Sequence, residues 1–225
     1  MRIFYIRWKE IKKHQKGMVK RMTILYEIYD NLYVNLTNRC PCACTFCLRQ
    51  DRDEMNHSGS LWLEREPSVE EVKREFDHFD MTKYKEVVFC GFGEPTERLE
   101  DLLEIAAFIK ERYGLPVRVN TSGLADLIYK KDTAPMFQGL VDTVSISLNT
   151  PEKADYHRLT RNRFGEESFD ALLLFAERVK QYVPKVVLTT VETTITKEQE
   201  KKCQEICDRL GVFYRIRPWE SNTLS

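Results

Sequence analysis

Short apolar or β-branched runs alternate six times with longer segments of helical period, starting at Leu32. Two of the longer segments carry helix-end signals: Ser68 is followed three residues later by Glu71 in a capping box, and Gly114 closes another segment. Such alternation favours parallel β-α-β units, whose functional loops gather at the carboxyl ends of the strands. An incomplete barrel and an open doubly wound sheet both satisfy this order.

The same pattern predicts the individual elements. Strands are predicted at residues 32–37, 86–91, 116–121, 142–149, 185–192 and 212–218, and helices at 68–79, 97–114, near 133–140, at 167–181 and at 197–211. No internal repeat or linker composition interrupts the chain after Met22. A length of 225 residues suits one substantial core rather than two. We therefore expect a single core domain over residues 22–225.

Charge excludes some partners. The 35 basic residues balance the 35 acidic residues, so no net field favours a nucleic acid or an anionic membrane. No run approaches the roughly 18 apolar residues of a membrane helix, and no signal peptide is recognisable at the N-terminus. The seven cysteines lack the spacing of a secreted disulfide framework. We expect a cytoplasmic protein whose thiols serve metal or redox chemistry.

Residues 1–21 differ from the remainder. They contain eight Lys or Arg and one acidic residue, Glu10, and a further methionine follows at Met22. A basic arm or targeting helix is one interpretation. The other, which we favour, is an extension upstream of a natural start at Met22, because nothing downstream requires the segment.

The stretch "CPCACTFC", residues 40–47, contains four of the seven cysteines. Cys40, Cys44 and Cys47 form a C-x3-C-x2-C pattern in which three thiolates hold three irons of a 4Fe-4S cluster and leave the fourth iron open to a ligand. Phe46 lies between the last two and has an aromatic face for a bound nucleoside. Cys42 is surplus, and we predict a non-ligating thiol turned away by the tight loop that Pro41 begins; an alternative ligand is the other interpretation.

Three further polar clusters follow predicted strands. They are "GFGEPT" (91–96), "NTSG" (120–123) and "SLN" (147–149). In a parallel sheet these clusters and the cysteine stretch lie on one rim, where a site on this architecture forms.

These motifs together resemble the radical S-adenosylmethionine (SAM) superfamily over about residues 28–218. The resemblance implies a partial (β/α)6 barrel of parallel strands that binds a 4Fe-4S cluster and SAM. It also implies an enzyme that reductively cleaves SAM to a 5′-deoxyadenosyl radical, which abstracts hydrogen from an unknown substrate. A flavodoxin or ferredoxin is the implied electron donor. Within the superfamily, "NLYVNLTNRCPCACTFCLRQ" most resembles small proteins associated with TatD-type hydrolases, which implies a functional link to such a hydrolase.

The resemblance also implies a cofactor site at the rim. At Gly91 and Gly93 the missing β-carbon lets backbone carbonyls approach the amino group of SAM, and Glu94 adds a charged acceptor. Pro95 restricts the backbone conformation where the chain leaves this loop. An ordinary strand-to-helix turn is the alternative interpretation.

Short hydrogen-bonding side chains follow the next two strands. Asn120, Thr121, Ser147 and Asn149 suit a ribose diol and a carboxylate, although turn and capping roles explain them equally. Arg158, Arg161 and Arg163 follow as a basic segment, and we take Arg158 as the candidate clamp for the SAM carboxylate or an anionic substrate. A solvated basic turn is the alternative.

A second function class stays open at this point. A non-catalytic iron–sulfur electron-transfer protein or a zinc-binding protein also uses clustered cysteines. Cys203 and Cys207 lie four residues apart on a predicted helix, and we expect them to pack in the core rather than to bind a second metal.

Overall fold

The computed structural model describes residues 22–219. The predicted basic extension, residues 1–21, lies outside the described residues, as do residues 220–225. Within residues 22–219, none of the helices has the length and apolar character needed to cross a membrane.

One seven-stranded sheet runs in the order β1 to β7, and its edge strands are not paired with each other. All neighbouring strands from β2 onward are parallel, which confirms the predicted α/β fold and its six parallel strands. The strands are β1 (Leu25–Ile28), β2 (Asn31–Val34), β3 (Glu86–Phe89), β4 (Val117–Thr121), β5 (Thr143–Ser147), β6 (Lys185–Val191) and β7 (Phe213–Arg217).

The first strand, β1, was not predicted from the sequence. It pairs antiparallel with β2 through a tight hairpin in which Tyr29 has a positive φ of 52°. Glycine or asparagine normally marks such a turn, and here a tyrosine adopts the conformation, so the sequence signal is absent. Four residues are also too few to show a period.

The helices connect successive strands. They are α2 (Val69–Glu75), α3 (Leu99–Tyr113), α4 (Ala125–Tyr129), α5 (Lys153–Thr160), α6 (Glu167–Val179) and α7 (Lys197–Leu210), with 3-10 turns that include η5 (Pro95–Arg98) and η6 (Ala134–Phe137). The helix predicted near 133–140 is only the short turn η6, and Pro135 lies at its start. Helix α5 was not predicted, because its sequence KADYHRLT is largely polar.

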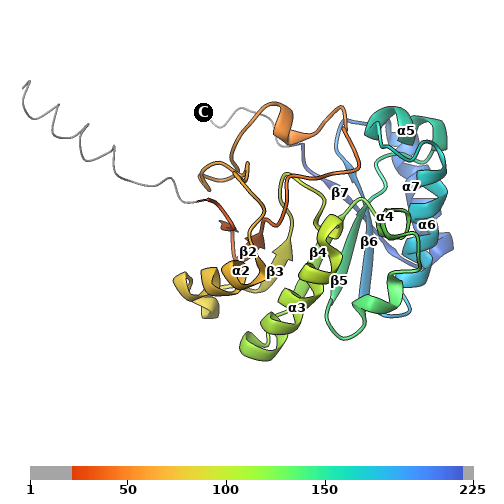
Figure 1. Cartoon of the computed structure of the whole chain (residues 1–225). Coiled ribbons are helices and arrows are strands. Elements are labelled where there is room, and N and C mark those ends of the chain that lie inside the picture. Colours follow the sequence, from red (N-terminus) through yellow and green to blue (C-terminus); the bar gives the residue numbers. More distant parts are fainter. Residues whose placement is uncertain (1–21, 220–225) are drawn as a thin grey trace, which may run out of the picture.

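The two faces of the sheet differ in character. Val87, Val119, Val144 and Leu188 belong to the main core, together with the buried residues of the helices. Figure 1 shows α3, α6 and α7 lying along this side of the strands. Alternate residues of each strand point to the opposite side. We call that side the inner face and define it by Tyr33, Val88, Arg118, Asn120, Ser145 and Arg215.

Candidate functional site

The cysteine loop follows β2 at the carboxyl end of the sheet. Its four thiols are unequal: Cys42 is 6% exposed and belongs to the main core, whereas Cys40, Cys44 and Cys47 are partly exposed. Because Cys42 is buried, the accessible thiols of this loop are the three of the C-x3-C-x2-C pattern.

Helix α5 and the turn after it hold the cysteine loop in place. Three backbone hydrogen bonds of 2.9 Å join them, from Ala43 to Thr160, from Thr45 to Leu159 and from Arg163 to Pro41. Asn162 holds the turn itself, since its side-chain amide donates to the hydroxyls of Thr160 and Ser168. Sequence reasoning missed this role and assigned the segment to anion binding, because a contact across about 115 positions leaves no local pattern.

Hydrogen bonds between the thiols set their protonation. The pKa of Cys42 is raised by its hydrogen bonds with Cys40 and Cys44 and by burial. Conversely, the hydrogen bond from Cys42 lowers the pKa of Cys44, and the positive charge of Arg49 adds to this effect. Burial raises the pKa of Cys47, which Arg49 partly offsets. Cys42 therefore keeps its proton more readily than Cys44 does.

In the part of the chain that the structure describes, no three Cys, His, Asp or Glu side chains converge on a point suited to one metal ion. A single zinc ion would need such convergence, with ligands about 2.0 to 2.3 Å from one centre. An iron–sulfur cluster instead takes each thiolate on a different iron. The neighbouring thiols of the cysteine loop therefore suit an iron–sulfur cluster better than a single zinc ion.

The "GFGEP" loop packs directly against the loop that carries the cysteines. A β-carbon on Gly93 would lie 2.1 Å from the carbonyl oxygen of Thr37 and 2.6 Å from that of Arg39. A β-carbon on Gly91 would lie 2.2 Å from Oδ1 of Asn35. Both glycines therefore let two loops approach each other, a role that the sequence interpretation, which assigned them to cofactor approach, did not include.

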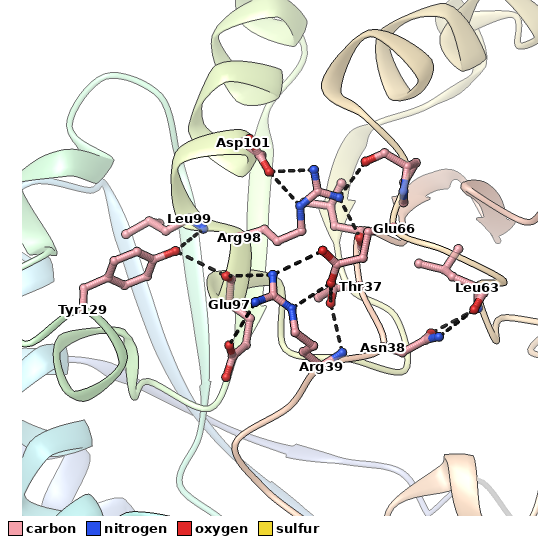
Figure 2. A network of polar contacts seen from close by, with 12 residues as sticks. Thr37, Asn38, Arg39, Leu63, Glu66, Glu97, Arg98, Leu99, Asp101 and Tyr129 are labelled. Carbon is pink, nitrogen blue, oxygen red and sulfur yellow. Dashed lines mark hydrogen bonds and ion pairs between the residues drawn. The ribbon is translucent and has the colours of Figure 1, made fainter.

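A polar network fixes the residues just before Cys40 (Figure 2). Arg39 Nε donates to Glu66 at 2.8 Å, and its guanidinium lies 3.9 Å from the carboxylate of Glu97. The Thr37 hydroxyl donates to the same Glu66 carboxylate. Nearby, Arg98 pairs with Asp101 and donates to two backbone carbonyls, so it ties α3 to the same region. The approach to Cys40 is thus held from three segments.

The Glu94 side chain is 4% exposed and serves first as a structural acceptor. Its Oε1 accepts from the Thr96 amide and hydroxyl and from the Thr121 hydroxyl, at 3.1, 2.7 and 2.7 Å. Its Oε2 accepts from the Ser122 amide at 2.6 Å. A carboxylate has about four lone-pair sites, two on each oxygen, so Oε2 retains capacity for one more donor. The sequence did not reveal these protein partners.

The remaining predicted cofactor residues lie at the same rim, and their predicted roles stay predictions. Asn149 is 3% exposed with a φ of 64°, and its Oδ1 has no hydrogen-bond partner among residues 22–219. Asn120 contacts Arg118, and the Thr121 hydroxyl is engaged with Glu94. Phe46 and Ser147 are half-buried, and Pro95 is buried at the start of η5.

Arg158 is an exposed residue of α5. Its side chain is 74% exposed on α5 and pairs with Asp155 at 2.9 Å. This exposure and the ion pair fit the solvated basic turn of the alternative interpretation, and the predicted role of Arg158 as a carboxylate clamp stays a prediction. The neighbouring Arg163 pairs with Glu97 at 3.2 Å, which joins the turn after α5 to η5.

Two further buried polar atoms have no partner in the described residues. They are Oγ of Ser122 and the hydroxyl of Tyr156, a fully buried side chain on α5. Burial raises the pKa of Tyr156, and the nearby Cys42, Cys44 and Glu94 add to the effect. A buried hydroxyl without a hydrogen-bond partner raises the free energy of the folded protein. A bound group that supplies this partner would therefore bind more tightly. Sequence patterns did not reveal this tyrosine.

Comparison with known families decides the affiliation. The family model described as the Radical SAM superfamily matches residues 34–210. The chain belongs to the radical SAM superfamily. This superfamily binds a 4Fe-4S cluster and SAM. The matched part of this chain begins at the end of β2 and includes the cysteine loop, the "GFGEP" loop and α5.

Curated relatives match only part of the chain. A probable GTP 3',8-cyclase from Thermococcus kodakarensis is 30% identical over 159 residues, which cover 70% of this chain and 46% of the relative. A probable dual-specificity RNA methyltransferase from Exiguobacterium sibiricum is 31% identical over 123 residues, 48% of this chain and 32% of the relative. The chain thus spans less than half the length of these relatives.

Solved structures show the same fold. Streptococcus suis SuiB bound to S-adenosylmethionine aligns with a TM-score of 0.66 at 18% identity, over 98% of this chain and 47% of that chain. A radical SAM methyltransferase from Sphaerobacter thermophilus aligns with a TM-score of 0.61 at 16% identity, over 86% of this chain and 57% of that chain. The partial-barrel fold predicted from the resemblance is confirmed.

Proposed function

We propose that this chain is a radical SAM enzyme whose cluster is held by Cys40, Cys44 and Cys47. When bound, the cluster supplies the electron that cleaves SAM to methionine and a 5′-deoxyadenosyl radical, which abstracts hydrogen from a substrate. The relatives act on different molecules by their names, GTP for one and RNA for another, so the substrate does not follow from them.

The close packing of the two motifs supports this proposal most directly. Gly93 lies against the carbonyl groups of Thr37 and Arg39, so the cysteine loop and the "GFGEP" loop form one structure although more than 40 positions separate them. A non-catalytic electron carrier has no need of a second loop built beside its cluster. A cofactor that binds to the open iron does need one.

The other residues of the rim have separate tasks in this proposal. Glu94 orders its loop through four protein donors and accepts from the SAM amine through Oε2. Asn149 Oδ1 accepts a hydrogen bond from a polar group of the cofactor, and the Ser122 hydroxyl donates one to it. The Cys42 thiol stays protonated and donates to its neighbours instead of binding iron.

The proposal extends to the cellular context. The electron donor is a flavodoxin or ferredoxin, as the family affiliation suggests, and the enzyme works in the cytoplasm. The functional link with a TatD-type hydrolase rests on the sequence resemblance alone.

Anaerobic reconstitution tests the proposal. The wild type and Cys42→Ala are expected to hold the cluster, measured by bound iron and sulfide and by visible absorbance. Alanine at Cys40, Cys44 or Cys47 is expected to lose most of it. After reduction, chromatography is expected to show 5′-deoxyadenosine from the wild type and none from Cys44→Ala.

Two results would contradict parts of this proposal. Loss of the cluster in Cys42→Ala would mean that the ligand set is wrong. A wild-type protein with an intact cluster that neither binds nor cleaves SAM would refute the enzyme proposal and support the electron-transfer alternative.

A further inference from the structure

Arg49 joins the two loops of the candidate site. It lies on the 3-10 turn η2 (Leu48–Gln50), two residues after Cys47, and its side chain is half-buried. Its Nη2 donates to the carbonyl oxygen of Cys42 at 3.0 Å, and its Nη1 donates to that of Phe92 at 3.3 Å. Phe92 is the second residue of the "GFGEP" loop. A single side chain therefore spans both motifs.

The residues that carry the two acceptors are anchored in separate cores. Cys42 is 6% exposed and belongs to the main core. Phe92 is 7% exposed and belongs to a second core with Tyr26 and Leu61, and its ring centre lies 5.1 Å from that of Trp62. The guanidinium therefore has a defined position between two fixed carbonyls. Its planar fork of donors can bond to both, whereas the single ammonium of a lysine presents no such fork.

These hydrogen bonds also place a charge beside the cysteines. Both acceptors are neutral carbonyl oxygens, so the bonds leave the positive charge of Arg49 in place. Arginine keeps its proton in proteins, which makes this charge permanent. Cys40 and Cys44 lie two residues on either side of Cys42, and two residues span at most about 7 Å. The charge therefore lies next to the loop that supplies the thiolates.

A permanent positive charge in this position affects electron transfer to a cluster. One-electron reduction makes the cluster and its thiolates more negative, so a nearby cation stabilises the reduced form more than the oxidised form. We propose that Arg49 is a positioning residue that holds the cysteine loop against the "GFGEP" loop and raises the reduction potential of the cluster. This inference rests on the proposed function, since it requires a 4Fe-4S cluster on Cys40, Cys44 and Cys47.

A purely structural role is the competing explanation. Arg98 shows what such a role looks like: it donates to two backbone carbonyls, and its ion pair with Asp101 compensates its charge. A structural role for Arg49 would change the cluster content of its variants but would leave the reduction potential of the bound cluster unchanged. The potential therefore distinguishes the two explanations.

A redox titration of the reconstituted protein tests the inference. The cluster is reduced stepwise by titanium(III) citrate, which supplies one electron per metal ion, with redox mediators and without SAM. Electron paramagnetic resonance measures the reduced form. The test variants are Arg49→Gln and Arg49→Lys. Arg112→Gln is the matched control, since it removes the same charge from an exposed arginine that pairs with Asp77. Arg112 lies about 20 Å along α3 from the start of that helix.

The potential should depend on the charge at position 49. Arg49→Gln is expected to lower the equilibrium constant for reduction about tenfold, which shifts the one-electron potential by about 59 mV to more negative values. Arg49→Lys keeps the charge and should shift the potential less than half as far. Arg112→Gln should titrate like the wild type. Both variants of Arg49 should bind less iron and sulfide, because neither side chain spans both carbonyls.

Several results would overturn the inference. They are equal potentials in the wild type and Arg49→Gln, equal shifts in Arg49→Gln and Arg49→Lys, an equal shift in Arg112→Gln, or full cluster content in both variants of Arg49. If Arg49→Gln holds too little cluster to titrate, Arg49→Lys decides: a potential like that of the wild type supports the inference, and a tenfold change in the equilibrium constant refutes it.

Failure of the proposed function has a different signature. The titration contains no SAM, so a wild type that holds the cluster but neither binds nor cleaves SAM refutes the proposed function and leaves the role of Arg49 to be read from the potentials. A wild type that assembles no cluster refutes both.

Discussion

The backbone N–H of Glu94 donates a 2.8 Å hydrogen bond to the carbonyl oxygen of Arg39, the residue immediately before Cys40. This bond makes the position of the first cysteine depend on the loop after β3. The absent β-carbon of Gly93 permits the approach. A change in either loop should therefore affect the other.

Gly93→Ala tests this dependence. Its β-carbon would collide with backbone carbonyls that cannot rotate away, so we expect a loss of about 1–3 kcal/mol in the free energy of unfolding and a reduced cluster content. Urea unfolding and bound iron measure the two effects. Gly114→Ala is the control: its φ is 64° but nothing lies within 4 Å, so it should lose about 1–2 kcal/mol and keep its cluster. A Gly93→Ala protein with full cluster content would contradict the argument.

Substitution of Glu94 should have two separable effects. Glu94→Gln keeps an acceptor for Thr96 and Thr121, but it loses the charge and the acceptor for the Ser122 amide, so SAM affinity should fall by about one to two decades with the cluster retained. Glu94→Ala leaves buried donors unpaired and should in addition lower the free energy of unfolding by roughly 2–4 kcal/mol. Calorimetry with SAM and urea unfolding measure these effects. Unchanged SAM affinity in Glu94→Gln would limit this residue to its structural role.

A substitution at Asn149 tests the cofactor site without changing the backbone conformation. Glycine adopts a φ of 64° without strain, so Asn149→Gly removes only the side chain with the unpaired Oδ1. We expect stability in the absence of SAM to change by less than about 1 kcal/mol, while SAM affinity falls by about five- to tenfold. Thermal unfolding with and without SAM measures both, because a ligand stabilises the state that it binds. Equal stabilisation by SAM in variant and wild type would exclude a contact at Asn149.

Acid should weaken the network before Cys40. The pKa of Glu66 is lowered from 4.5: burial alone would raise it, but the hydrogen bonds from Thr37 and Arg39 outweigh burial. The folded carboxylate therefore holds its proton less tightly than the unfolded one, so its contribution is complete above about pH 4.5 and is lost as the pH falls through the folded pKa. Urea unfolding from about pH 5 to 3 should show a smaller fall in stability for Glu66→Gln than for the wild type. Parallel pH curves would contradict this expectation.

The order of the elements and the ligand pattern could be predicted because both are local. Periods of two and about 3.6 residues depend on neighbouring positions, and they predicted six of the seven strands together with α2, α3, α6 and α7. The spacing of Cys40, Cys44 and Cys47 is local in the same sense, since one short loop contains the whole set. Strand β1 and helices α4 and α5 escaped prediction, since a tyrosine turn, a five-residue helix and a polar helix show no such pattern.

The partners of these local features were decided by the tertiary structure. Gly91 and Gly93, which the sequence assigned to the cofactor, also allow two loops to pack closely. Glu94, which the sequence assigned to the SAM amine, also accepts hydrogen bonds that order its own loop. Arg158 was selected for its charge and lies at the surface, whereas Asn162, which no motif marked, holds the turn that packs against the cysteine loop. Sequence spacing specifies which side chains are present on each element. Only the packing of strands and loops brings together groups that are distant in the chain, and the energies of burial, repulsion and hydrogen bonding depend on that proximity.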